Sequence, residues 1–122
     1  MVRTGFSLLA ALLCCAALAG PTPAPVRAEI NLLLDRLQNS GCQFNRNGTW
    51  GSGAQARAHL LRKLNHLEGE VTLKSTEQFI ELAASTSSVS GKPYEVQCTG
   101  KGTMTSAEWL QKELVFIRLT RS

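Results

Sequence analysis

Apolar residues recur at helical spacing in four segments of the chain. The four sets are Ile30, Leu33, Leu34 and Leu37; Ala56, Leu60, Leu64 and Leu67; Phe79, Ile80, Leu82 and Ala83; and Leu110, Leu114 and Ile117. Residues three and four apart lie on one side of an α-helix, so each set forms a stripe that can face a core. In the second segment, Arg57, Arg62 and Lys63 are expected to point largely away from the stripe. The pattern therefore predicts four amphipathic helices.

Three of these helices have a recognisable start signal, the capping box. It occurs as SGAQ at Ser52, STEQ at Ser75 and TSAE at Thr105. The first hydroxyl of this motif accepts hydrogen bonds from first-turn amides, and the Gln or Glu three positions later reaches back to the first amide. The remaining helix is expected over residues 29–39, because Gly41 follows as a stop signal.

Strand signals are weaker and are confined to two segments. A period of two, typical of a half-buried strand, is present over residues 94–98 and over residues 42–46. Asn47-Gly48 then supplies the positive φ angles of a tight hairpin turn. We therefore expect a mainly helical α+β fold, in which about four helices pack with a small antiparallel sheet of two or three strands.

The first 28 residues are not expected to belong to this domain. Arg3 is followed by an almost uninterrupted apolar run from Phe6 to Ala19. This run has the length of a signal-peptide core and is shorter than the roughly 20 residues that span a membrane. Small residues allow cleavage after Ala19 or after Ala28. We favour the second point, because the first helix then opens the mature chain, and residues 29–122 form a single small domain.

Removal of residues 1–28 leaves two of the four cysteines, Cys42 and Cys98. Two cysteines in an exported chain usually form a disulfide, which for a loop of this length stabilises the fold by about 4 kcal/mol in the chain-entropy model. A zinc site is the alternative, but two cysteines without neighbouring histidines make a poor zinc shell. We therefore expect a Cys42–Cys98 disulfide, and no metal or other cofactor.

The charge of the chain gives little indication of an acidic partner. The whole sequence has 13 basic and 9 acidic residues and a formal net charge of +4. Removal of residues 1–28 takes away Arg3 and Arg27 and no acid, so the net charge falls to +2. The sequence shows no basic cluster with interleaved aromatics, which argues against nucleic-acid binding.

A loop rich in hydroxyl groups, STSSVSGKPY, occupies residues 85–94. Backbone amides beside Gly91 could hold an anion together with Lys92. The loop lacks the residue order of a phosphate-binding P-loop and the SxxK spacing of serine acyl enzymes. A polar connection between a helix and a strand is therefore the simpler interpretation.

Two histidines, His59 and His66, lie seven residues apart on the second predicted helix. His59 could serve as a general base, which would make the protein a small hydrolase. No GxSxG elbow marks a nucleophile, and the spacing is too wide for the metal-binding pair of an HExxH helix. A partly exposed helical histidine is the commoner explanation.

Aromatic and polar side chains gather around the predicted hairpin. They are Phe44, Arg46, Asn47 and Trp50, which the disulfide brings towards Tyr94. Aromatic residues and arginine are the side chains that anchor interfaces. We expect Phe44 to pack in the core, whereas Trp50 could belong to the core or to a binding surface.

Several motifs of the chain occur together in one protein family. They are Cys-x-Phe-x-Arg-Asn-Gly from Cys42, Ala-x-x-His-Leu from Ala56, Glu-x-Phe-Ile from Glu77, Ser-Gly-Lys-Pro-Tyr from Ser90 and a closing Trp-Leu pair at Trp109. Over nearly all of residues 29–119 the chain resembles a family of small exported bacterial proteins known only as a domain of unknown function. The resemblance implies a periplasmic or cell-envelope location and no particular activity. Arg46, His59 and Lys92 fall in its motifs without an evident structural need for them.

We therefore expect a small, monomeric protein that is secreted or exported to the periplasm and acts as a binding or accessory module rather than as an enzyme. Its binding face would contain Arg46, Asn47, Lys92 and Tyr94. Such donors suit a small anionic or carbohydrate-like ligand, or a protein of the cell envelope. The alternative is the hydrolase that uses His59 as its general base.

Overall fold

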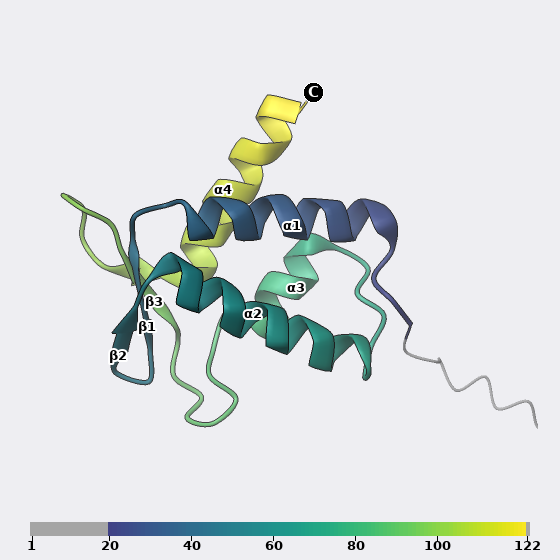
Figure 1. Cartoon of the computed structure of the whole chain (residues 1–122), viewed down its shortest axis with the longest axis horizontal. Coiled ribbons are helices and arrows are strands. Elements are labelled where there is room, and N and C mark those ends of the chain that lie inside the picture. Colours follow the sequence, from purple (N-terminus) through teal and green to yellow (C-terminus); the bar gives the residue numbers. More distant parts are fainter. Residues whose placement is uncertain (1–19, 122) are drawn as a thin grey trace, which may run out of the picture.

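The computed structural model describes residues 20–121, and this part of the chain forms four helices and four short strands. The helices are α1 (Ala24–Gln38), α2 (Gly53–Glu68), α3 (Thr76–Ala83) and α4 (Ser106–Arg121), and the strands are β1 (Gln43–Arg46), β2 (Thr49–Gly51), β3 (Glu95–Gln97) and β4 (Met104–Thr105). In Figure 1, α1 and α2 run side by side and the strands gather at one end of these helices. The predicted mainly helical α+β fold is confirmed.

The predicted capping residues begin three of the helices, but only one capping box is complete. The Ser52 hydroxyl accepts from Gln55 N at 3.2 Å, and the Gln55 side chain accepts from Ser52 N at 2.8 Å. The hydroxyls of Ser75 and Thr105 also accept from amides three residues on. The Gln78 side chain, however, accepts from Lys74 N rather than from its cap.

Helix α1 begins at Ala24, five residues before the predicted start at Glu29. Three prolines, at positions 21, 23 and 25, precede the expected start, and such a run is also typical of an extended chain. Pro25 lies in the first turn instead, where a missing N–H has no consequence because first-turn amides lack a helical partner. Residues 1–19 lie outside the described residues, so the predicted signal peptide stays a prediction.

The strands form one antiparallel sheet in the order β2-β1-β3-β4. Phe44 of β1 pairs with Gly51 of β2 and with Val96 of β3. Asn47 and Gly48, with φ angles of 55° and 86°, make the predicted hairpin turn. The sheet has one strand more than expected, because the two-residue strand β4 is too short to show an alternating pattern.

The predicted disulfide joins the β1 and β3 segments. Cys42 and Cys98 lie one residue beyond the Gln43–Gln97 pair, with sulfur atoms 2.02 Å apart. The bond therefore reinforces a strand pairing between segments that are more than fifty residues apart in the sequence.

Most members of the four predicted apolar stripes are buried in one core. Leu82 is an exception, because 42% of it is exposed. Phe44 is buried as predicted and packs edge-to-face on Trp109, with ring centroids 5.6 Å apart. Trp50, whose place the sequence left open, is 39% exposed and therefore lies at the surface.

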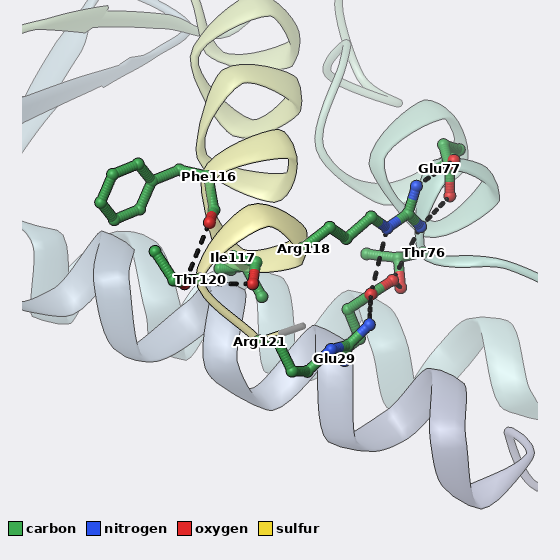
Figure 2. A network of polar contacts seen from close by, with 8 residues as sticks. All are labelled: Glu29, Thr76, Glu77, Phe116, Ile117, Arg118, Thr120 and Arg121. Carbon is green, nitrogen blue, oxygen red and sulfur yellow. Dashed lines mark hydrogen bonds and ion pairs between the residues drawn. The ribbon is translucent and has the colours of Figure 1, made fainter.

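A buried carboxylate, Glu29, joins α1 to α3 and α4 (Figure 2). It accepts hydrogen bonds from Thr76 Oγ1 at 2.5 Å, from Arg118 Nη2 at 2.8 Å and from Arg121 Nη2 at 2.7 Å. Arg118 also binds Glu77 of α3 at 2.8 Å. Chiefly through the hydrogen bond from Arg118, the pKa of Glu29 is lowered to about 2. Glu29 is thus ionised at neutral pH, and its contacts link the three helices α1, α3 and α4.

Candidate functional site

A cavity of about 350 Å³ lies between α2 and the β1–β2 hairpin. Its apolar lining includes Leu37, Phe44, Ala56, Leu60, Ala84 and Leu110, and its polar lining includes Asn45, Arg46, Thr49, Gln55, His59, Arg62 and Tyr94, with Trp50 beside them. The volume is at the lower end of the range for small-molecule sites, which commonly combine an apolar wall with a few placed polar groups.

Two of the polar groups, those of Arg46 and Tyr94, are positioned by the backbone of the sheet and of the segment that leads into it. Phe44 and Arg46 point to the same face of β1 because they are two residues apart, so Phe44 enters the core and Arg46 extends over the cavity. Tyr94 precedes β3 and is held on both sides by its backbone. Its N–H donates to Ser85 O at 3.0 Å, and its C=O accepts from Ser106 N at 2.8 Å.

Helix α2 supplies a histidine and two cations from neighbouring turns. His59, Arg62 and Lys63 are three and four residues apart, so they share one side of the helix. Arg62 and Lys63 were expected only to point away from the apolar stripe. The contact of the Lys63 ammonium group with Tyr94 was not predicted. Lys63 follows His59 by four residues on α2. This spacing was the sequence signal that could have predicted that the two side chains lie close together.

A chain of hydrogen bonds connects β1, α2 and Tyr94. Arg46 Nη1 lies 2.5 Å from His59 Nδ1, and His59 Nε2 lies 3.2 Å from Tyr94 Oη. A guanidinium group can only donate, so Nδ1 accepts and the imidazole proton resides on Nε2. Lys63 Nζ donates to the same Tyr94 oxygen at 3.2 Å. Tyr94 Oη therefore accepts two hydrogen bonds and keeps its own proton for another acceptor.

The environment of His59 keeps its ring neutral. Burial, as the largest cause, and the positive charges of Arg46, Lys63 and Arg62 together lower the pKa of His59 to about 4. The ring also meets Tyr94 edge-on, with centroids 5.7 Å apart. At neutral pH this histidine is thus a neutral donor through Nε2.

The cavity wall carries positive charge without a matching negative one. Among the described residues that line it, none is aspartate or glutamate. The carboxylate of Glu95 accepts from Asn45 Nδ2 at 3.1 Å but does not itself line the cavity. Arg46 and Arg62 therefore face a space whose described walls offer no carboxylate.

The four residues predicted to form the binding face do not all meet. Arg46 and Tyr94 line the cavity together with His59. Asn47 serves a different purpose, because Nδ2 donates to Ser87 Oγ at 3.0 Å and Oδ1 accepts from Ser90 Oγ at 2.6 Å, which fastens the 85–93 loop to the hairpin. Lys92 is exposed and does not line the cavity.

The loop hydroxyls are used within the loop itself. Ser87 Oγ accepts from the amides of Val89 and Ser90, at 3.1 and 3.3 Å. Ser90 Oγ accepts from Lys92 N at 3.2 Å. These local hydrogen bonds are typical of a polar connection between a helix and a strand.

No observation on the described residues favours hydrolysis. Both ring nitrogens of His59 are engaged, one by Arg46 and one by Tyr94. Of the two serines that line the cavity, Ser52 and Ser106, the first caps α2 with its hydroxyl. Within residues 20–121, no three His, Cys, Asp or Glu side chains gather to hold a metal ion. In the same range, no helix has both the length and the apolar character needed to cross a membrane.

Comparison with known proteins identifies relatives but no activity. Residues 24–118 match the model of a family of unknown function, DUF5329. The uncharacterized protein YfeK of Salmonella typhimurium is 40% identical over 68 residues, which are 55% of this chain and 55% of the relative. The matched segment thus spans about half of that relative. No solved structure matches the chain.

Proposed function

The chain belongs to the bacterial family of unknown function that its residues 24–118 match, and we propose that it binds a small organic anion in the cavity between α2 and the β1–β2 hairpin. This role is that of a binding or accessory module rather than of an enzyme. It keeps Arg46 and Tyr94 of the predicted binding face, adds His59 and Arg62, and leaves Lys92 outside.

The pairing of the arginines carries this proposal. Seven arginines lie within residues 20–121. Five of them, at positions 27, 36, 57, 118 and 121, pair with a carboxylate. The two described arginines without such an ion pair, Arg46 and Arg62, both line the cavity. A charged group of a ligand would supply the missing partner, since Arg donors bind carboxylate and phosphate oxygens well.

The neutral donors of the cavity favour the same ligand. The Tyr94 hydroxyl proton is not used by Lys63 or His59, because both of these donate to the hydroxyl oxygen. A ligand oxygen could accept this proton beside Arg46. The apolar wall, which includes Phe44 and Leu60, and the exposed ring of Trp50 suit a ligand with an apolar or aromatic body.

The location that we propose is an oxidising compartment outside the cytoplasm. The Cys42–Cys98 disulfide supports it, and so does the apolar N-terminal run of the sequence. We expect a monomer there. Light scattering of purified protein tests this state.

Contacts of the residues before Glu29 favour signal cleavage after Ala19 over cleavage after Ala28. Thr22 is buried, and both its N–H and its hydroxyl donate to Glu68 Oε2, at 2.9 and 2.7 Å. Arg27 pairs with the same carboxylate at 3.1 Å. Cleavage after Ala28 would delete these contacts and the first turn of α1. The intact mass of the exported protein distinguishes the two products.

The binding proposal is tested by calorimetry with benzoate and phenyl phosphate, and with neutral benzamide as the uncharged comparison. We expect saturable binding of the anions only, and a loss of about tenfold or more in the Arg46→Gln variant, because one charge-assisted hydrogen bond contributes about 1.5–3 kcal/mol. Lys112→Gln on exposed α4 removes the same charge outside the cavity and should change nothing. Equal effects of the two variants, or no binding of either anion, would contradict the proposal.

A further inference from the structure

A second hollow of about 440 Å³ adjoins the first along α2. It is lined by His59, Arg62, Lys63, His66, Leu67, Glu70, Leu82, Thr86 and Ser88. His59 and Arg62 line both hollows, so these two side chains form the boundary between them. A ligand that crosses the boundary would touch Arg46 at one end and the last turns of α2 at the other.

Each hollow has a cation of its own. Arg46 lines only the first hollow and Lys63 only the second. Lys63 contacts neutral oxygens, those of Thr86 C=O at 3.3 Å and Tyr94 Oη at 3.2 Å. The acid that lines the second hollow, Glu70, follows the end of α2 and pairs with His66 at 3.0 Å.

The exposure of Leu82 also points to this hollow. Leu82 belongs to an apolar stripe of α3, yet 42% of it is exposed, and it lines the second hollow beside Leu67. An apolar segment of a ligand that lies against Leu82 would remove this surface from water. The second hollow therefore offers apolar contact as well as positive charge.

We propose that the two hollows form one site for an elongated organic ligand with an acidic group at each end. One acidic group binds Arg46, the other binds Lys63 beside Tyr94, and the apolar portion passes over His59 towards Leu82. This inference rests on the proposed function and specifies the ligand class.

The test uses a graded series of linear α,ω-dicarboxylates and the monocarboxylates of the same chain lengths, each titrated into the purified full domain by calorimetry. We expect a length at which the dicarboxylate binds at least tenfold more tightly than its monocarboxylate, since the second acid gains its own charge-assisted contact. Lys63→Gln should abolish this advantage, whereas Arg46→Gln should weaken both ligands.

Because Lys63 also supports Tyr94, a second variant pair leaves that contact intact. Leu82→Glu places a negative charge in the second hollow from an exposed position, and Leu82→Gln is its neutral match. We expect the first to weaken only the dicarboxylate, and thermal unfolding to confirm that both variants are folded. Equal affinity for the two ligand types, or insensitivity to both Lys63→Gln and Leu82→Glu, would overturn the elongated site but leave the anion-binding function standing.

Two further outcomes are informative. Tighter binding of long polyphosphate than of any dicarboxylate would overturn the assignment to a small ligand. Failure of both carboxylate series and of the aromatic anions to bind would overturn the proposed function, and this inference with it.

Discussion

Arg46 Nη1 and His59 Nδ1 are 2.5 Å apart, although the residues lie on different elements, β1 and α2. Since the guanidinium group must be the donor, this contact fixes the neutral tautomer of His59 and directs its Nε2 proton to Tyr94. The same contact leaves the positive charge of Arg46 beside the cavity without a carboxylate among the described lining residues.

Replacement of Arg46 by Gln should raise the pKa of His59 above its value of about 4. The change removes one of the positive charges that disfavour the imidazolium ion, but burial, the larger cause, remains. The pKa should therefore rise without reaching its ordinary value. An NMR titration of the ring signals checks this, with Lys112→Gln as the control variant. An unchanged His59 titration would contradict the assigned contact.

Ligand-free protein should lose stability as the pH falls from about 6.5 to about 4, in part through His59. The pKa of this histidine is about 4 in the folded state and near 6.5 when unfolded, so in this window the unfolded chain binds more protons. The free energy of unfolding then decreases as pH decreases. Urea unfolding at several pH values should show a flatter dependence in His59→Gln, while Lys112→Gln, at an exposed position on α4, should behave like the unaltered protein.

Glu29→Gln should lower the free energy of unfolding by about 3 kcal/mol at neutral pH, because it leaves Arg118 and Arg121 without their shared buried carboxylate. The lowered pKa of Glu29, about 2, means that this stabilisation is present above about pH 4.5 and is lost as the pH falls towards 2. Glu77→Gln is the matched control, since Glu77 binds the same Arg118 from an exposed position. The Glu77→Gln variant should lose at most about 1 kcal/mol of its free energy of unfolding. An equal loss in both variants would contradict the role of Glu29 as the buried carboxylate that joins the helices.

Gly53→Ala should destabilise the protein by at least about 2 kcal/mol, because overpacked contacts between helices cannot relax easily. An added Cβ at Gly53 would collide with the carbonyl oxygen of Leu37 and approach that of Gln38 to 2.9 Å. Gly69→Ala is the control, since its Cβ would lie at an ordinary 3.4 Å from His66 O. Urea unfolding of the two variants should separate them clearly, and similar midpoints would show that α1 and α2 do not cross this closely.

Replacement of both Cys42 and Cys98 by Ser should cost about 4 kcal/mol, the loop-closure value for this length. That loss is large relative to a domain stability of about 5–15 kcal/mol. Anion affinity should also fall, because the bond holds the β1 segment that carries Arg46 beside the segment that carries Tyr94. Unfolding with and without a reductant checks the cause: the reductant should affect the unaltered protein and have no effect on the double variant.

The local signals of the chain predicted the helices well. Apolar spacing and the capping residues Ser52, Ser75 and Thr105 act over one or two turns, so neighbouring residues suffice to recognise them. The start of α1 was placed too late because prolines in a first turn and in an extended chain look alike in sequence. Whether Ala19 or Ala28 precedes the mature chain therefore remains a prediction for mass spectrometry.

The candidate site was predicted only in part, for a different reason. Arg46 and Tyr94 were predicted to share a binding face with Lys92, and His59 was named separately. The directions of the side chains in the folded protein place Lys92 outside the cavity and bring Lys63 to Tyr94. Residue types and local spacing thus determine the helices, the hairpin turn and the pair of cysteines, since these depend on short-range backbone preferences and simple covalent chemistry. The packing of α2 against the hairpin, an outcome of long-range burial, decides which cations share a cavity and which of them lack a counter-charge.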